Sequence, residues 1–162
     1  MKKVKIGLIG FGFMGTTHWG VYKGIKNAQV VALADLDPAK RKGDISKVVG
    51  NIGGGDNSKP IDLKDVAVYD DPMKLIKEAD VDMIDICVPT ADHAKLAIAA
   101  LKAGRHVFCE KPLCRTAAEV REIVAAAKKA KGFFNVGLCV RAWPEYRHAY
   151  EYFKSGKAGK ML

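Results

Sequence analysis

Three glycines with a characteristic spacing stand near the start of the chain. Gly10, Gly12 and Gly15 form the pattern G-x-G-x-x-G between an apolar run and a segment with helical periodicity. In such a pattern the first glycine permits a tight turn, the second lets a diphosphate approach the backbone, and the third lets the helix pack closely on the strand. The residues between the glycines complete the predicted phosphate-binding turn: Phe11, Phe13 and Met14. The positive N-terminal end of the following helix would then face the anion.

An acidic residue follows at the distance that this chemistry needs. Asp35 ends the next apolar run, about twenty residues after the last glycine, where a carboxylate can accept hydrogen bonds from a ribose diol. Leu36 is expected to border the same ribose. Asp35 could instead cap a helix or close a turn, a role that Asp37 could also fill. Glycines, strand, helix and acid together predict a site for an adenine dinucleotide.

The residues around Asp35 also bear on which dinucleotide binds. The 2′-phosphate of NADP would lie beside the negative charge of Asp35, and Leu36 and Asp37, rather than an arginine, follow it. We therefore expect NAD, with NADP as the less favoured cofactor. Lys40 or Arg41 could still reach in from the following segment, which leaves NADP open.

The apolar pattern alternates between short β-rich runs and longer helical ones. This alternation predicts an α/β protein with a Rossmann-type, doubly wound parallel sheet and three layers, α/β/α. We expect strands at 4–10, 28–35, 66–71, 81–90, 105–112 and 133–142, and helices at 14–27, 38–50, 72–79, 91–104, 116–132 and 144–156. Thr116 and Glu119 are placed as a capping box, and Gly104 is expected to end its helix in a left-handed conformation. Residues 50–65, rich in glycine and polar residues, are expected to form an exposed flexible loop.

Length and composition fit an ordinary globular domain and exclude several classes. The chain has 162 residues, enough for one domain with a sizeable core. Its net charge of +9 comes from 27 basic residues against 18 acidic ones, but these are scattered, so we expect no nucleic-acid partner. No apolar run approaches the roughly 20 residues that cross a bilayer, so we expect no membrane contact and a cytoplasmic protein.

The four cysteines give no sign of a metal centre. They form no C-x-x-C pair and have no histidine at zinc-site spacing: Cys87, Cys109, Cys114 and Cys139. We expect reduced thiols that act as small core residues, and no metal ligands.

Several segments together resemble the Gfo/Idh/MocA oxidoreductases, a family that includes glucose-fructose oxidoreductase and inositol dehydrogenase. The resemblance extends over essentially the whole chain. It rests on GFGFMGTTH at 10–18, ALADLDP at 32–38, VPTADH at 88–93, GRHVFCEKPL at 104–113, VGLCVRAWPEY at 136–146 and SGKAGKML at 155–162. The E-K-P tripeptide after one strand and the R-x-x-P after the next are its most specific parts.

The resemblance implies roles for residues in these segments. Lys111 of the E-K-P motif would lie by the nicotinamide and the substrate and act as the catalytic residue, preceded by Glu110. Pro89 and Thr90 would border the cofactor ribose and nicotinamide, with Thr90 in place of an asparagine and its hydroxyl able to cap the next helix. Two further residues, His93 and Arg141, are placed near the cofactor. Because His93 falls in the first turn of a helix, packing or hydrogen bonding is the more natural role for it than proton transfer.

The resemblance also implies a domain organisation. Residues 1–156 would form the dinucleotide-binding domain, and residues 157–162 would begin a second, truncated domain. In the family that second α/β domain supplies most substrate contacts and a catalytic histidine. We therefore expect this chain alone to bind the cofactor better than it catalyses, and an exposed face to favour homo-oligomers.

The function expected from these features is that of the cofactor domain of an NAD-dependent oxidoreductase. Its reaction would be hydride transfer between nicotinamide and a hydroxyl carbon of a sugar, polyol or related small molecule. Two alternatives stay open. One is a non-catalytic NAD(P)-binding sensor or regulatory module; the other is an S-adenosylmethionine methyltransferase, in which the E-K-P segment would have no role.

Overall fold

Six parallel strands form one sheet in the order β3-β2-β1-β4-β5-β6. The computed structural model describes residues 2–50 and 59–160. The strands are β1 (Val4–Ile9), β2 (Ala28–Ala34), β3 (Ala67–Tyr69), β4 (Met83–Ile86), β5 (His106–Cys109) and β6 (Phe134–Val136). The chain starts in the middle of the sheet, proceeds outward to β3 and returns beside β1 with β4. The expected doubly wound parallel sheet is therefore confirmed, and its order reverses between β1 and β4.

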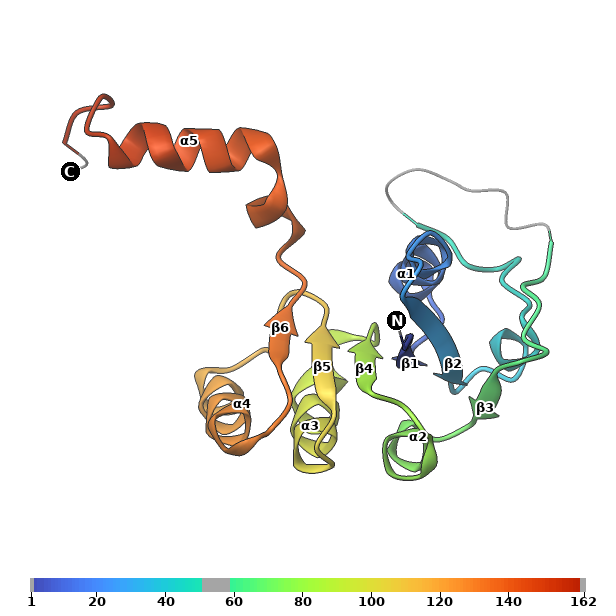
Figure 1. Cartoon of the computed structure of the whole chain (residues 1–162). Helices are drawn as coiled ribbons and strands as arrows, with labels where there is room; N and C mark the ends of the chain where they lie inside the picture. The colour runs from blue at the N-terminus through green and yellow to red at the C-terminus, as the bar shows by residue number, and fades with distance from the viewer. Residues whose placement is uncertain (1, 51–58, 161–162) are drawn as a thin grey trace.

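Helices cover both faces of this sheet. They are α1 (Phe13–Lys23), α2 (Pro72–Glu78), α3 (Thr90–Lys102), α4 (Ala117–Lys129) and α5 (Pro144–Lys154), with short 3₁₀ helices η1 (Lys40–Lys42) and η2 (Cys139–Ala142). Figure 1 shows α2, α3 and α4 below the sheet and α1 on its other side, which gives the expected three layers. Helix α5 extends away from the sheet in that view and has no buried residue.

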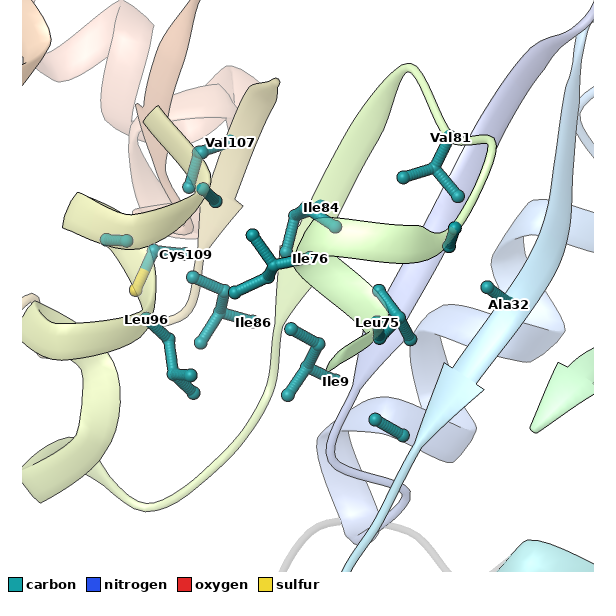
Figure 2. Close-up of a cluster of buried hydrophobic side chains, with 14 of the residues drawn as sticks. Ile9, Ala32, Leu75, Ile76, Val81, Ile84, Ile86, Leu96, Val107 and Cys109 are labelled. Carbon is teal, nitrogen blue, oxygen red and sulfur yellow. The ribbon is translucent and has the colours of Figure 1, made fainter. Parts of the chain in front are cut away.

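The larger part of the core lies between the sheet and the layer of α2, α3 and α4. Leu75 and Ile76 of α2 are buried and point toward Ile9, Ile84 and Ile86 of the central strands, as Figure 2 shows. Because both faces of the central strands are covered, their runs are almost continuously apolar. This packing fixes β1 and β4 side by side, with their carboxyl ends at one edge.

Two local features of the helices match the sequence prediction. Thr116 and Glu119 form a capping box at the start of α4, with each side chain accepting a backbone N–H of the other. Gly104, just after α3, has a φ of +77°, the left-handed conformation expected at a helix C-terminus.

The segment 38–50 does not form the predicted helix, and that prediction was wrong. Only η1 is helical, and Gly43 after it has a φ of +82°. A Cβ at Gly43 would lie 2.0 Å from the carbonyl oxygen of Ile61, so the two backbones cross there in close contact. Ile45 and Val48 lie in irregular backbone instead, and their side chains pack against the α1 face of the sheet.

The segment 133–142 also differs from its prediction. It is a strand only over β6 and then turns into η2, which carries Arg141. Of the predicted loop at 50–65, residues 51–58 lie outside the described residues, as do 161–162 of the predicted second-domain start. Residues 157–160 form a turn followed by irregular backbone. Within the residues that the structure describes, none of the helices has the length and apolar character needed to span a bilayer.

Candidate cofactor-binding site

A cavity of about 660 Å³ opens at the carboxyl ends of β1, β2 and β4, where the strand order reverses. It brings together six residues that the sequence places in the site: Gly10, Gly12, Met14, Asp35, Leu36 and Pro89. Ligands of open α/β sheets bind at this kind of edge. The other predicted residues do not line this cavity: Phe11, Phe13, Gly15, Thr90, His93, Glu110, Lys111 and Arg141.

The three glycines of the turn differ in their structural surroundings. Gly10 has a φ of +92°, and a Cβ there would lie 2.7 Å from the carbonyl oxygen of Cys87. A Cβ at Gly15 would lie only 1.9 Å from the carbonyl oxygen of Gly10, so the start of α1 contacts the turn directly. A Cβ at Gly12 would meet no atom of another described segment within 4 Å. The backbone at Gly12, the N-cap of α1, is therefore open to a ligand.

Asp35 is held beside this turn by backbone hydrogen bonds. One carboxylate oxygen, Oδ2, accepts the N–H of Phe11 at 2.6 Å, and the other, Oδ1, accepts the N–H of Asp37 at 2.8 Å. A carboxylate offers about four acceptor positions, so about two are left for other donors. Asp35 thus presents acceptors to the cavity from a fixed position next to the glycine turn.

Two basic side chains lie near Asp35. Lys40 Nζ is 4.0 Å from its Oδ2. The guanidinium of Arg41 donates through Nη1 to the carbonyl oxygens of Asp35 and Leu36, at 2.9 and 2.8 Å. Arg41 therefore holds the loop after β2 in place. The positive charges of Lys40 and Arg41 lie beside the predicted ribose position.

The cavity includes wall residues that the sequence prediction missed: Asp71, Pro72, Met73, Asp92 and Lys95. Asp71 caps α2 by accepting the N–H of Met73 at 2.8 Å. These residues come from the loop after β3, the first turn of α2 and the first two turns of α3. Their place at the carboxyl edge was the available signal; among them only Asp92 falls within a quoted motif, VPTADH at 88–93, where it was given no role.

Glu110 and Lys111 follow β5 at the same edge, beyond the cavity. Glu110 is buried and its Oε2 accepts the backbone N–H of Lys111 at 3.1 Å, whereas the Lys111 side chain is exposed. Arg141 lies elsewhere, in a separate hollow of about 560 Å³ beside β6, which Arg147 also lines. The roles of these residues toward cofactor and substrate stay predictions.

His93 joins the loops after β4 and β5. Its side chain is buried, with Nδ1 2.9 Å from the carbonyl oxygen of Pro112 and Nε2 2.8 Å from that of Val88. These contacts agree with the expected hydrogen-bonding role. Thr90 does not cap α3 as expected: the helix begins at Thr90 itself, so its N-cap is Pro89, which offers no side-chain acceptor.

A polar group that was not predicted from the sequence lies behind the site, between α1 and β4. Asp85 is buried, and its Oδ2 lies 2.8 Å from His18 Nδ1 and 2.8 Å from the hydroxyl of Tyr22, which donates to it. The thiol of Cys87 lies 3.3 Å from His18 Nδ1 and donates to Asp85 Oδ1 at 3.5 Å. Asp85 stands in an otherwise apolar strand, which was the one signal in the sequence.

His18, Asp85 and Cys87 are residue types that bind metals, and their ligand atoms lie within 4.8 Å of one another. Two ligands of a tetrahedral zinc ion, each about 2.0–2.1 Å from the metal, would be about 3.3 Å apart. The 2.8 Å between His18 and Asp85 fits a direct hydrogen bond better. The absence of a metal role thus stays a prediction, and hydrogen bonding accounts for the cluster.

The protonation of this group follows from its surroundings. Burial lowers the pKa of His18, but the hydrogen bond and charge of Asp85, with Glu110, outweigh this and raise it above the ordinary 6.5. Burial next to Asp85 raises the pKa of Tyr22 and that of Cys87 far above their usual ranges, so both stay protonated. Burial likewise raises the pKa of Cys109, a core residue, to about 12.

The raised pKa of His18 predicts a pH dependence of stability. Its contribution to the free energy of unfolding is full below about pH 6.5 and is lost as pH rises through the higher folded-state value. We expect urea denaturation to give a lower free energy of unfolding near pH 8 than near pH 6. Both pH values lie below the ordinary pKa of cysteine, 9.0. The His18→Gln variant should show a smaller decrease; an equal decrease in both proteins would contradict the assignment.

Comparison with known proteins assigns the family. The class that fold and site define is a dinucleotide-binding domain of Rossmann type. A family model described as "Oxidoreductase family, NAD-binding Rossmann fold", GFO_IDH_MocA, matches residues 4–138. The chain therefore belongs to this oxidoreductase family, and the resemblance seen in the sequence is confirmed.

Its similar relatives include inositol dehydrogenases. Myo-inositol 2-dehydrogenase of Thermotoga maritima is 31% identical over 157 residues, which cover 97% of this chain and 42% of that protein. Inositol 2-dehydrogenase of Acidothermus cellulolyticus is 33% identical over 163 residues, covering 99% of this chain and 43% of that protein. The chain thus spans less than half the length of these relatives.

Solved structures give the same result. Scyllo-inositol dehydrogenase of Lactobacillus casei, with bound NAD(H) and scyllo-inositol, superposes with a TM-score of 0.80 at 27% identity, covering 98% of this chain and 43% of that one. The fold is that of the cofactor-binding part of these dehydrogenases.

Proposed function

We propose that this chain is the NAD-binding part of an oxidoreductase that acts on a hydroxyl carbon of a polyol or sugar. The observation that carries this proposal is the position of Asp35 beside the open backbone of Gly12 in one cavity. Family membership supports it, and NAD(H) is named in the structure of a relative. Both favour the dinucleotide over S-adenosylmethionine.

The residues present fit a dinucleotide. The uncovered backbone at Gly12 leaves space for a diphosphate at the N-terminus of α1, where free N–H groups and the helix dipole favour an anion. Asp35 has acceptor positions left for the adjoining ribose hydroxyls. The apolar side chains of Leu36 and Met73 offer a wall for the adenine ring. These residues would bind the cofactor and fix its orientation.

Lys111 is the residue that we propose to bind the substrate hydroxyl and to stabilise its oxygen as the proton leaves. Bound NAD would accept a hydride from the substrate carbon. The exposed ammonium of Lys111 can donate a hydrogen bond to the substrate hydroxyl and stabilise the negative charge that develops on its oxygen. The proton itself would pass to a base outside this chain, the role that the family resemblance gives to the histidine of the second domain. Glu110 fixes the backbone of Lys111 through their 3.1 Å hydrogen bond. The names of the inositol dehydrogenase relatives support a cyclic polyol as the substrate class.

The preference for NAD over NADP is a prediction for the Asp35→Ala variant. Removing the carboxylate takes away a charged acceptor, worth about 1.5–3 kcal/mol, and should weaken NAD about tenfold or more. NADP should lose less, because its 2′-phosphate no longer faces a negative charge while Lys40 and Arg41 stay nearby. Isothermal titration of both cofactors measures the two losses.

The matched control is Asp37→Ala, which removes a neighbouring carboxylate that does not line the cavity and accepts the N–H of Ala39. Its NAD affinity should stay within about twofold of the unmodified chain. Equal losses of NAD and NADP in Asp35→Ala would contradict the role assigned to Asp35 in cofactor choice.

Self-association and a cytoplasmic location also stay predictions. The aromatic side chains of α5 are exposed: Tyr146, Tyr150, Tyr152 and Phe153. Large exposed apolar patches mark interaction sites. We expect light scattering to give a mass above that of one chain as concentration rises; a monomer throughout would contradict this.

A further inference from the structure

A carboxylate in the centre of the sheet needs a compensating charge. Asp85 has 0% exposure, and burying an unpaired carboxylate costs several kcal/mol. Tyr22 and Cys87 donate neutral hydrogen bonds to it. His18, 2.8 Å away, is the only group facing Asp85 among the described residues that can carry a positive charge.

The second ring nitrogen of His18 faces another carboxylate. Its Nε2 lies 3.4 Å from Glu110 Oε1, on the opposite side of the ring from Asp85. A neutral imidazole has one N–H donor, whereas an imidazolium has two. Two carboxylate partners therefore favour the charged ring.

The described groups around the ring are carboxylates or uncharged side chains, so none of them opposes a positive charge on the ring. Asp85 and Cys87 face it from β4 and the residue that follows, Tyr22 from α1, and Glu110 from the end of β5. The ring of Phe108 meets it edge-on, with 5.7 Å between centroids. No second cation in the described part of the chain competes for the two carboxylates, and the ring itself is only 15% exposed.

Glu110 connects this ring to the predicted catalytic residue. While Oε1 faces His18, Oε2 accepts the backbone N–H of Lys111. A Cβ at Gly137 would lie 2.5 Å from Glu110 Oε1, so the carboxylate packs directly against the backbone after β6. Glu110 therefore has little freedom to move, and His18 supplies the opposite charge that holds it.

We propose that His18 is a positioning residue: its imidazolium bridges Asp85 and Glu110 and thereby holds the Glu110–Lys111 backbone at the nicotinamide end of the cofactor site. The bridge itself stands on the geometry of this chain alone. Its effect on cofactor binding rests on the proposed function. Two experiments separate these parts.

The bridge is tested by NMR of the unmodified chain, labelled with ¹⁵N. Both ring nitrogens of His18 should carry protons at low pH, and the midpoint of their titration should lie above the ordinary histidine pKa of 6.5. The signals are assigned by their loss in His18→Gln. In Asp85→Asn the midpoint of the titration should move to lower pH. A titration midpoint at or below 6.5 in the unmodified chain would overturn the proposal.

The positioning role is tested by comparing NAD with ADP-ribose, which lacks the nicotinamide. In His18→Gln we expect NAD to bind about five- to tenfold more weakly and ADP-ribose to stay within about twofold. His148→Gln, an exposed histidine on α5, is the matched control and should change neither. An unchanged ratio of the two affinities in His18→Gln would overturn the positioning role.

The outcomes also distinguish this inference from the proposed function. If the unmodified chain binds neither NAD nor ADP-ribose, the proposed function fails and the positioning role with it, while the NMR result still decides the bridge. If it binds ADP-ribose and the nicotinamide adds nothing to affinity in any variant, the site stands and the positioning role is overturned.

Discussion

The Gly15→Ala variant should lose about 3 kcal/mol or more of its free energy of unfolding. A methyl group at this position would lie 1.9 Å from the carbonyl oxygen of Gly10, far inside contact distance. Both atoms belong to fixed backbone, at the start of α1 and at the end of β1, so neither can move without displacing the helix. Thermal unfolding should show a melting temperature lower by roughly 10 °C.

A matched control is available in the same helix. Gly20 lies in the interior of α1, is exposed, and a Cβ there would meet no atom within 4 Å. Gly20→Ala should therefore stabilise the chain by about 0.5–1 kcal/mol, the usual gain from replacing glycine in a helix. If Gly15→Ala were as stable as Gly20→Ala, the close approach of helix and turn would be disproved.

In contrast to Gly15→Ala, the Gly12→Ala variant should keep its fold but bind the cofactor more weakly. The backbone of Gly12 has a φ of −83°, which alanine adopts freely, and among the described residues the added methyl would meet no atom within 4 Å beyond its own local backbone. The methyl would instead occupy the space left for the diphosphate. We expect NAD affinity to fall at least about tenfold, while the melting temperature changes little.

The same Gly20→Ala variant serves as the control for binding, because it makes the same chemical change outside the cavity. Its NAD affinity should equal that of the unmodified chain. Calorimetric titration of the three proteins measures the effect. Unaltered NAD binding by Gly12→Ala would show that the diphosphate does not approach this backbone.

The sequence predicted what depends on local pattern. The alternation of short apolar runs with helical periodicity is local, so the parallel sheet and most helices were predictable. The positions of the glycine turn and Asp35 at strand ends were predictable for the same reason, while their role toward the cofactor stays a prediction. The capping box of Thr116 and Glu119 spans only four residues and was also found.

What the sequence did not predict depends on contacts between distant segments. The helix expected over 38–50 fails because Gly43 adopts a left-handed conformation against the backbone of Ile61, a crossing that periodicity does not record. Asp85 interrupts an apolar strand, but its partners His18 and Tyr22 are 67 and 63 residues away along the chain. Only the packing of α1 on β4 brings them together.

The most direct measurement of the central claim is a titration of the ¹⁵N-labelled chain with NAD, followed by backbone amide shifts. The account predicts the largest changes at Gly12, Met14 and Gly15 and at Asp35 and Leu36, around one cavity. Saturable changes confined to other surfaces, such as α5 or the hollow beside Arg141, would contradict it, as would no change at all.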